Sequence, residues 1–432
     1  MKRKLSVIEH LVFETFEKEN IHFAFTAGIT GSFTYDGLTS AIVKIRTKHP
    51  LLSVRIDVDS KGRAYFVSDN LVGPLIRIVD RNSDEQWINE EWAELHTPID
   101  LRNGPVTRFV WIKGEHKSEL IFVCHHIISD GRAAAYVLRD ILFCLGDLNY
   151  EIKPYKMLPG VAQLIPKKIR LNPLFLINTK RSALKKIKEI KKNAAGTKEI
   201  KQPKIYHTEY TILHWELTRE QTDTLLNRAR EEKTSIHPVI HVAMLEAFSK
   251  TLGRNEVPLV VKTPTDIKNK LSSKLKEDTL GTSFAIPKYM AYKYKPRKNF
   301  WQMARDIKGE LAKQIDVKTL FFELTVLEYL RPVASYLASS IFPVNPADSI
   351  SFLTLSNMGI LDIPLLYGSV KLDFFQVSAP ILGNEHILLL MSVGGNMYFS
   401  LVTSKEKMDK EQSQQIKKQF LASLEKAICW YL

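Results

Sequence analysis

The stretch from residue 119 to residue 145 places the tightest constraint on how this chain can fold. Leu120–Cys124 is an unbroken apolar run of strand length, rich in β-branched and aromatic residues, which is typical of a strand buried on both faces. After Gly131, apolar residues recur at helical spacing as far as Leu145. His125 and His126 therefore lie where a buried strand ends, and because adjacent strand residues face opposite sides, only one of them can point into any one site.

Simple structural roles are open for each residue of this cluster. Ser129 or Asp130 could cap the helix, since both side chains accept hydrogen bonds from orphan N–H groups. Gly131 could only relieve crowding in the turn, and one histidine could be a satisfied interior residue. A metal site is weakly supported, because no third and fourth ligand lies nearby in the sequence. Taken together, these roles explain the combination less well than one functional site does.

The cluster resembles the His-His-x-x-x-Asp-Gly signature of the condensation-domain and alcohol acyltransferase superfamily, whose fold is that of chloramphenicol acetyltransferase. His125, His126, Asp130 and Gly131 fill its four fixed positions. The resemblance implies that His126 is the catalytic base and that His125 faces away in a structural role. It also implies that Asp130 orients the site through an ion pair with an arginine, and that Gly131 keeps a substrate channel open beside the histidine.

Other segments resemble the same superfamily in the expected order. Residues 97–108 are similar to its Phe-Asp-Leu-x-x-Gly-Pro-Leu-x-Arg segment, and His49–Leu52 to its His-Pro-Leu-Leu turn. Many members carry an arginine directly after that turn, where this chain has Ser53. Arg55 is two residues further on, hence on the same face of a strand, so we expect Arg55 to be the partner of Asp130. A solvated strand charge is the alternative for Arg55.

The second half of the chain carries weaker matches. Residues 263–268 and the sequence Leu280-Gly281-Thr282 are similar to a Pro-x-x-x-Arg and a Leu-Gly-Asn motif, with Lys268 in place of the arginine and Thr282 in place of the asparagine. Residues 352–359 match a Ser-Asn-x-Gly strand end. From this match we expect oxyanion or substrate contacts from Thr354, Ser356 and Asn357. Ordinary hydrogen bonding at a strand end is the alternative for each.

The order of elements predicts an α/β (α+β) fold of two chloramphenicol acetyltransferase-like lobes, a pseudo-dimer with a channel between them. We expect an N-terminal lobe over residues 1–150 that carries the signature, a basic linker over 151–205, and a C-terminal lobe over 206–432. The linker has several prolines and a lysine-rich run, which indicate a connection that is partly helical and partly mobile.

The positive charge of the chain is concentrated in this linker. Residues 167–204 contain 13 Lys/Arg and two acids, a net +11 of the chain's +14. A solvated linker is one interpretation, and a docking surface for an anionic partner is the other. Candidate partners are an acyl carrier protein, the phosphates of coenzyme A, or peripheral contact with an anionic membrane. Nucleic acid is not expected, because the run lacks interleaved aromatic residues and a recognisable binding motif.

The sequence thus predicts an enzyme, an acyltransferase that moves an acyl group from a coenzyme A or acyl-carrier thioester to a hydroxyl acceptor, with His126 as general base. The alternatives are a stand-alone condensation enzyme of the nonribosomal-peptide type that acylates an amine, and a non-catalytic member of the fold. We expect no metal and no tightly bound cofactor, since the coenzyme A or phosphopantetheine thioester is itself a substrate. Three scattered cysteines and the lack of a long apolar run predict a cytoplasmic protein.

Overall fold

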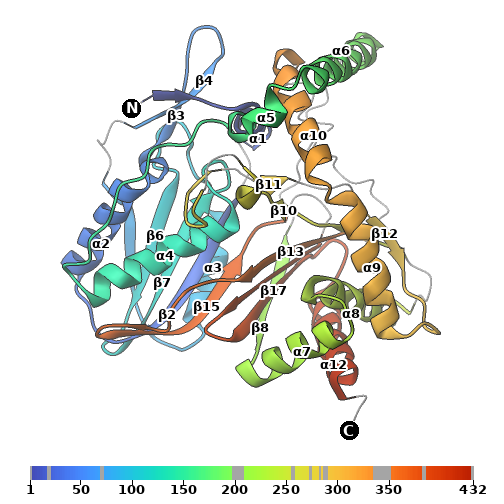
Figure 1. Cartoon of the computed structure of the whole chain (residues 1–432). Coiled ribbons are helices and arrows are strands. Elements are labelled where there is room, and N and C mark those ends of the chain that lie inside the picture. The colour runs from blue at the N-terminus through green and yellow to red at the C-terminus, as the bar shows by residue number, and fades with distance from the viewer. Residues whose placement is uncertain are drawn as a thin grey trace.

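Two six-stranded sheets form the framework of the protein (Figure 1). The computed structural model describes residues 2–16, 21–68, 73–196, 209–253, 258–271, 275–281, 284–285, 290–333, 352–381 and 386–429. Thr282, residues 197–204 of the basic segment and the predicted lobe boundary at 205–206 lie outside these ranges.

The first sheet is centred on the strand that leads to the histidine pair. In spatial order its strands are β14 (Leu366–Tyr367), β15 (Val370–Ser378), β2 (His22–Thr30), β7 (Lys117–His125), β6 (Thr107–Lys113) and β5 (Ile76–Asp80). Both faces of β7 are buried from Ser118 to His125, as its apolar run predicts. The helices of this half are α1 (Val7–Phe16), α2 (Tyr35–Lys48), α3 (Gln86–His96) and α4 (Gly131–Gly146).

The second sheet repeats this architecture in the other half of the chain. Its strands are, in order, β12 (Met290–Lys293), β9 (Pro258–Lys262), β13 (Phe352–Ile360), β16 (His386–Val393), β17 (Asn396–Ser404) and β8 (Tyr210–Leu217). Its helices are α7 (Arg219–Glu231), α8 (Ile236–Thr251), α9 (Phe300–Gln314), α10 (Val317–Tyr329) and α12 (Lys410–Cys429).

Smaller elements complete the described part of the chain. One small sheet joins β1 (Lys2–Lys4), β4 (Ala64–Val67) and β3 (Arg55–Val58), and another pairs β10 (Thr265–Asp266) with β11 (Phe284–Ala285). Short 3₁₀ turns are η1 (Pro50–Ser53), η2 (Val161–Leu164), η3 (Lys268–Lys270) and η4 (Arg331–Val333). The predicted linker is helical over α5 (Lys167–Arg170) and α6 (Pro173–Gly196).

The two lobes share a hydrophobic core. Ile387 and Leu389 of β16 belong to the same buried cluster as Phe122 of β7, whereas Leu388 and Leu390 pack in a second cluster with α8 and α12. Since successive strand residues face opposite sides, one face of the second sheet covers the seam with the first lobe and the other carries its own helices. This arrangement confirms the predicted α/β pseudo-dimer.

The chain returns to the first sheet after it has entered the second, and then leaves it again. Strand β15 pairs with β2 over Lys371–Ser378 and so belongs to the first sheet, although it lies within the range 206–432 predicted for the second lobe. A division into lobes by residue number alone therefore does not describe the sheets. Among the described residues, no helix combines the length and the apolar character that crossing a bilayer requires.

Candidate active site

The turn between β7 and α4 is held on both sides by backbone hydrogen bonds. His125 N–H donates to the carbonyl of Val106, and His126 N–H donates to the carbonyl of Ile21. These bonds extend the pairing of β7 with its neighbours β6 and β2, and so fix the direction in which each imidazole leaves the backbone. The next element, α4, begins at Gly131 with Asp130 as its N-cap.

His126 is oriented by a hydrogen bond from its Nδ1 to the carbonyl oxygen of Ser129, 3.0 Å away. A carbonyl only accepts, so Nδ1 carries the proton and the lone pair of the neutral ring is on Nε2. The edge of Phe23 packs against the ring, with centroids 5.0 Å apart, and the side chain stays partly exposed. Burial lowers the pKa of His126 from 6.5, against the opposing charge of Asp130. The neutral form of the ring is therefore favoured at pH 7.

His125 is enclosed in the core and serves the backbone. Its Nδ1 accepts a hydrogen bond from Ile127 N–H at 3.1 Å, and the residue is 1% exposed. Burial holds its pKa well below 6.5, so the ring is neutral. Its neighbour Cys124 is also fully buried, and burial raises the pKa of that thiol well above its usual value. A thiolate nucleophile is therefore disfavoured here.

Asp130 joins the two lobes through an ion pair with Lys268. Asp130 Oδ1 accepts from Ala133 N–H at 3.0 Å and caps α4, while Oδ2 lies 2.7 Å from Lys268 Nζ. The side chains are 10% and 4% exposed, and Lys268 Nζ also donates to the carbonyl of Glu277. A buried carboxylate needs such an ion pair and hydrogen bonds, because removing a charge from water without them raises the free energy of the folded state.

The sequence predicts Arg55 as the partner of Asp130, whereas the structure gives Asp130 an ion pair with Lys268. Residues Pro50–Ser53 form the 3₁₀ turn η1, and the strand begins only at Arg55. The rule that residues two apart share a strand face therefore does not connect Ser53 with Arg55. Ser53 Oγ instead accepts a hydrogen bond from Arg46 Nε at 2.8 Å. Lys268, which stands where the superfamily motif has an arginine, is the cation that pairs with Asp130.

Gly131 lies close to β13 of the other lobe. A Cβ at this position would lie 2.8 Å from Met358 Sδ, so the missing side chain leaves room for a residue of the other lobe. Next to it, Arg132 donates to the carbonyl of Met358 and forms an ion pair with Glu277. The start of α4 is thus attached to the second lobe by several side chains as well as by the Asp130 pair.

The three predicted oxyanion contacts lie on β13 at the same seam. Thr354 and Ser356 pair with Ile387 and Leu389 of β16, which face the first lobe. Cross-strand partners share a face, so the two hydroxyls are directed toward the seam as well. Asn357 Oδ1 accepts a hydrogen bond from Gly359 N–H at 2.8 Å. This is the hydrogen bonding at a strand end that the sequence analysis gave as the alternative for Asn357. Their contact with a substrate stays a prediction.

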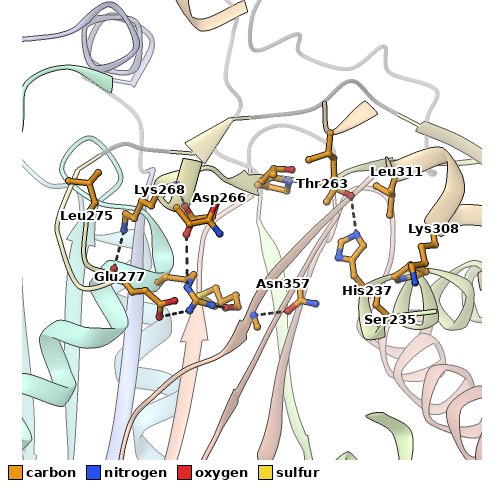
Figure 2. Close-up of a pocket in the computed structure, with 18 residues that line it drawn as sticks. Ser235, His237, Thr263, Asp266, Lys268, Leu275, Glu277, Lys308, Leu311 and Asn357 are labelled. Carbon is orange, nitrogen blue, oxygen red and sulfur yellow. Dashed lines mark hydrogen bonds and ion pairs between the residues drawn. The ribbon is translucent and has the colours of Figure 1, made fainter. Parts of the chain in front are cut away.

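A cavity of about 540 Å³ opens beside this cluster, within the range usual for small-molecule sites. Figure 2 shows Lys268 and Glu277 on one side of it, and His237 with Lys308 on the other. His126 does not line it; the cavity borders the partners of Asp130 and the end of β13. The lining residues are Arg132, Ser235, His237, Pro238, Thr263, Pro264, Thr265, Asp266, Lys268, Asn269, Leu275, Glu277, Lys308, Leu311, Ile315, Asn357, Met358 and Gly359.

His237 is a cavity residue that the sequence did not single out. It stands in the first turn of α8, its Nε2 lies 3.2 Å from Thr263 Oγ1, and burial lowers its pKa to about 4. The ring is therefore a neutral polar group in the wall. No local motif marks it, whereas Lys268 was marked by the Pro-x-x-x-Arg match. In the described part of the chain, no three His, Cys, Asp or Glu side chains come together as a metal site would require.

Comparison with known proteins gives matches in both halves of the chain. The family model "Condensation domain" matches residues 5–145, and the model "Phthiocerol/phthiodiolone dimycocerosyl transferase C-terminus" matches residues 208–379. A phthiocerol/phthiodiolone dimycocerosyl transferase of Mycobacterium leprae is 24% identical over 278 residues, which are 62% of each chain. The match thus spans less than two thirds of that curated relative.

Solved structures share the fold over nearly the whole length. Polyketide synthase associated protein 5 from Mycobacterium tuberculosis superposes with a TM-score of 0.67 and 14% identity, covering 100% of this chain and 98% of that one. A trichothecene 15-O-acetyltransferase from Fusarium sporotrichioides superposes with a TM-score of 0.73 and 11% identity, covering 99% and 95%. Both halves of the chain are therefore similar to condensation-type families, and the chain shares the chloramphenicol acetyltransferase-like fold over nearly its whole length.

Proposed function

We propose that the protein is an acyltransferase that moves an acyl group from a thioester to a hydroxyl acceptor, with His126 as general base. The observation that carries the proposal is the Nδ1 hydrogen bond to Ser129, which leaves the lone pair on Nε2 of a neutral, partly exposed ring. A neutral imidazole suits the removal of a hydroxyl proton during attack.

In the proposed reaction, the acceptor oxygen attacks the thioester carbonyl carbon as its proton passes to Nε2 of His126. The tetrahedral intermediate then expels the sulfur, which takes the proton back from the imidazolium and leaves as the free thiol. The thioester is already activated, so no covalent enzyme intermediate is needed. General-base assistance of this kind contributes about 10²–10⁴-fold to the rate. Thr354 and Ser356 face the seam and are the candidate donors to the oxyanion.

The names of two similar proteins support acyl transfer to an oxygen acceptor. The relative from Mycobacterium leprae is named a dimycocerosyl transferase, and the one from Fusarium sporotrichioides an O-acetyltransferase. For this chain the proposed donor is coenzyme A or a carrier-bound phosphopantetheine thioester, used as a substrate and not held as a cofactor. The positive net charge of the chain suits an acidic carrier protein as the source of a phosphopantetheine thioester. A cytoplasmic location and a role in lipid or secondary metabolism accord with such a donor.

Amide formation is the second candidate, because condensation domains are among the structural neighbours. The test is release of free thiol from a panel of acyl-coenzyme A and acyl-pantetheine donors, offered with alcohols or with amines. His126→Gln should lower the rate about 10²–10⁴-fold. His116→Gln is the matched control, since His116 is an exposed histidine outside the site.

The outcomes separate the candidates. Turnover with alcohols but not amines supports the proposed acyltransferase, and the reverse supports the condensation enzyme. Equal turnover in wild type and His126→Gln contradicts His126 as the base. A folded wild type without thiol release from any donor, whose binding of a pantetheine thioester is still measurable, would identify a non-catalytic member of the fold.

A further inference from the structure

The helix α6 (Pro173–Gly196) stands at the edge of the molecule and is attached to it along one face. Figure 1 shows it projecting beyond α10. Ala183, Ile187 and Ile190 pack into a small cluster with Val326 and Leu330 of the α10 region. Residues three and four apart lie on one side of a helix, so these contacts use a single stripe of α6.

The opposite stripe of α6 exposes large apolar side chains. Leu174 is 71% exposed, Ile177 45% and Leu184 59%, and Leu171, just before the helix, is 62% exposed. Spacings of three and seven residues put Leu174, Ile177 and Leu184 on one side. Of the thirteen exposed large apolar side chains in the described part of the chain, four lie within this one segment. Scattered single residues of this kind are normal on a protein surface, whereas a stripe on one helix indicates a partner.

Basic side chains lie beside the apolar stripe and, at Arg181, within it. The exposed ones between residues 167 and 190 are Lys167, Lys168, Lys180, Arg181, Lys185, Lys186 and Lys188, and the exposed acid in the same range is Glu189. Long basic side chains lay their methylene stems along apolar surface and keep the charge at its rim. Apolar side chains flanked by lysine and arginine on one helix are the pattern of a helix that lies in a membrane interface.

We propose that α6 docks the protein on the surface of an anionic lipid membrane, with Leu174, Ile177 and Leu184 immersed between the headgroups. A second copy of the chain is disfavoured as the partner, because two such segments would face each other with like charge. A carrier protein is disfavoured because a single convex helix presents apolar side chains without a groove. The surface of an anionic bilayer can accept both the positive charge and the convex apolar surface. The inference is independent of the proposed acyl transfer.

The test is sedimentation of the 432-residue chain with vesicles of phosphatidylglycerol and phosphatidylcholine, compared with vesicles of phosphatidylcholine alone. The wild type should bind only the anionic vesicles, and more weakly as salt is added. Neutralising three bases in Lys180→Gln/Arg181→Gln/Lys185→Gln should weaken binding about a hundredfold, from roughly fivefold for each charge near the surface. Leu174→Glu/Ile177→Glu should weaken it at least about tenfold.

The matched control variant is Lys61→Gln/Lys410→Gln/Lys418→Gln, which removes the same charge from exposed lysines outside α6. It should keep nearly all of the binding. Unchanged binding in both α6 variants, or equal losses in the matched variant, would overturn the proposal. So would a dimer that Leu174→Glu/Ile177→Glu abolishes without any vesicle binding, or tight binding of an acyl carrier protein that vesicles do not compete. Melting curves and thiol release with soluble substrates should be the same in all variants, which separates this test from that of the proposed function.

Discussion

Replacing Lys268 by methionine tests how the two lobes position the proposed base. Lys268→Met keeps the length of the side chain but removes its charge, and leaves Asp130 buried with the Ala133 N–H as its remaining hydrogen-bond donor among the contacts described above. The second member of a double-mutant cycle is Asp130→Asn, which still caps α4, because asparagine is as good an N-cap as aspartate.

The magnitude follows from burial. The two side chains are 4% and 10% exposed, so solvent screens their attraction little. Breaking a buried pair by removing one partner costs about 3–5 kcal/mol, whereas replacing both partners by uncharged groups is close to neutral. We therefore expect Lys268→Met to lower the free energy of unfolding by about 3–5 kcal/mol, and Asp130→Asn/Lys268→Met to recover most of that loss.

The catalytic rate should depend on the position of the Ser129 carbonyl oxygen, because this atom orients the His126 ring through a hydrogen bond. A shift of about 1 Å in such a support costs about 10²-fold in rate, so kcat should fall by this order in Lys268→Met while KM changes less. Lys268→Arg should restore the ion pair and most of kcat. Urea unfolding gives the stabilities, and thiol release gives the rates.

Arg55→Met is the matched control for this cycle. Because Lys268 forms the pair, Arg55→Met should show little coupling to Asp130→Asn. The reasoning is refuted if Lys268→Met and Asp130→Asn are additive in free energy, or if the coupling to Asp130 appears at Arg55 instead.

Three further predictions use the same geometry. The acid limb of kcat/KM should lie below pH 6.5, because burial lowers the pKa of His126 and the neutral ring persists to lower pH; a limb above 7 would contradict this. Lys48→Met should lower the free energy of unfolding by about 3–5 kcal/mol, measured in urea, because Lys48 Nζ lies 2.5 Å from Asp140 and 2.7 Å from Asp278 in a buried network. Lys61→Met, at an exposed lysine, is the control. The pKa of Asp140 is lowered to about 2, so its contribution of about 2 kcal/mol to the free energy of unfolding should be complete above pH 4 and lost as the pH falls toward 2. Thermal unfolding at a series of pH values measures this loss, and Asp140→Asn should reduce the dependence of stability on pH in this range.

Local chemistry explains what the sequence predicted well. The strand β7, the turn after it and the helix α4 are specified by a run of adjacent residues, so an apolar segment, an N-cap and a helical repeat suffice to place His126 at a strand end. The error in the strand boundary before Arg55 is local too. The sequence prediction placed Ser53 and Arg55 on one strand, but Pro50–Ser53 forms a 3₁₀ turn, and the period of two applies only after it.

Contacts between distant residues could not be predicted in the same way. Nothing in the sequence around Asp130 identifies Lys268 as its partner, because the pair forms only when the loop after β9 reaches α4. Strand β15 presents the same difficulty. Its alternation marks a strand but does not tell which sheet it enters, and its partner β2 lies near the other end of the chain.

These distant contacts make the proposed base a property of both lobes. The proton on His126 Nδ1 is held by Ser129, the next residue is Asp130, and Asp130 is held by Lys268 of the second lobe. The same half also supplies β15, which covers the edge of β2, and Met358, which packs where Gly131 leaves room. An isolated first lobe would expose the edge of β2 and leave the Asp130 carboxylate without its cation. We therefore expect packing of the second lobe to stabilise the tautomer in which Nε2 accepts a proton.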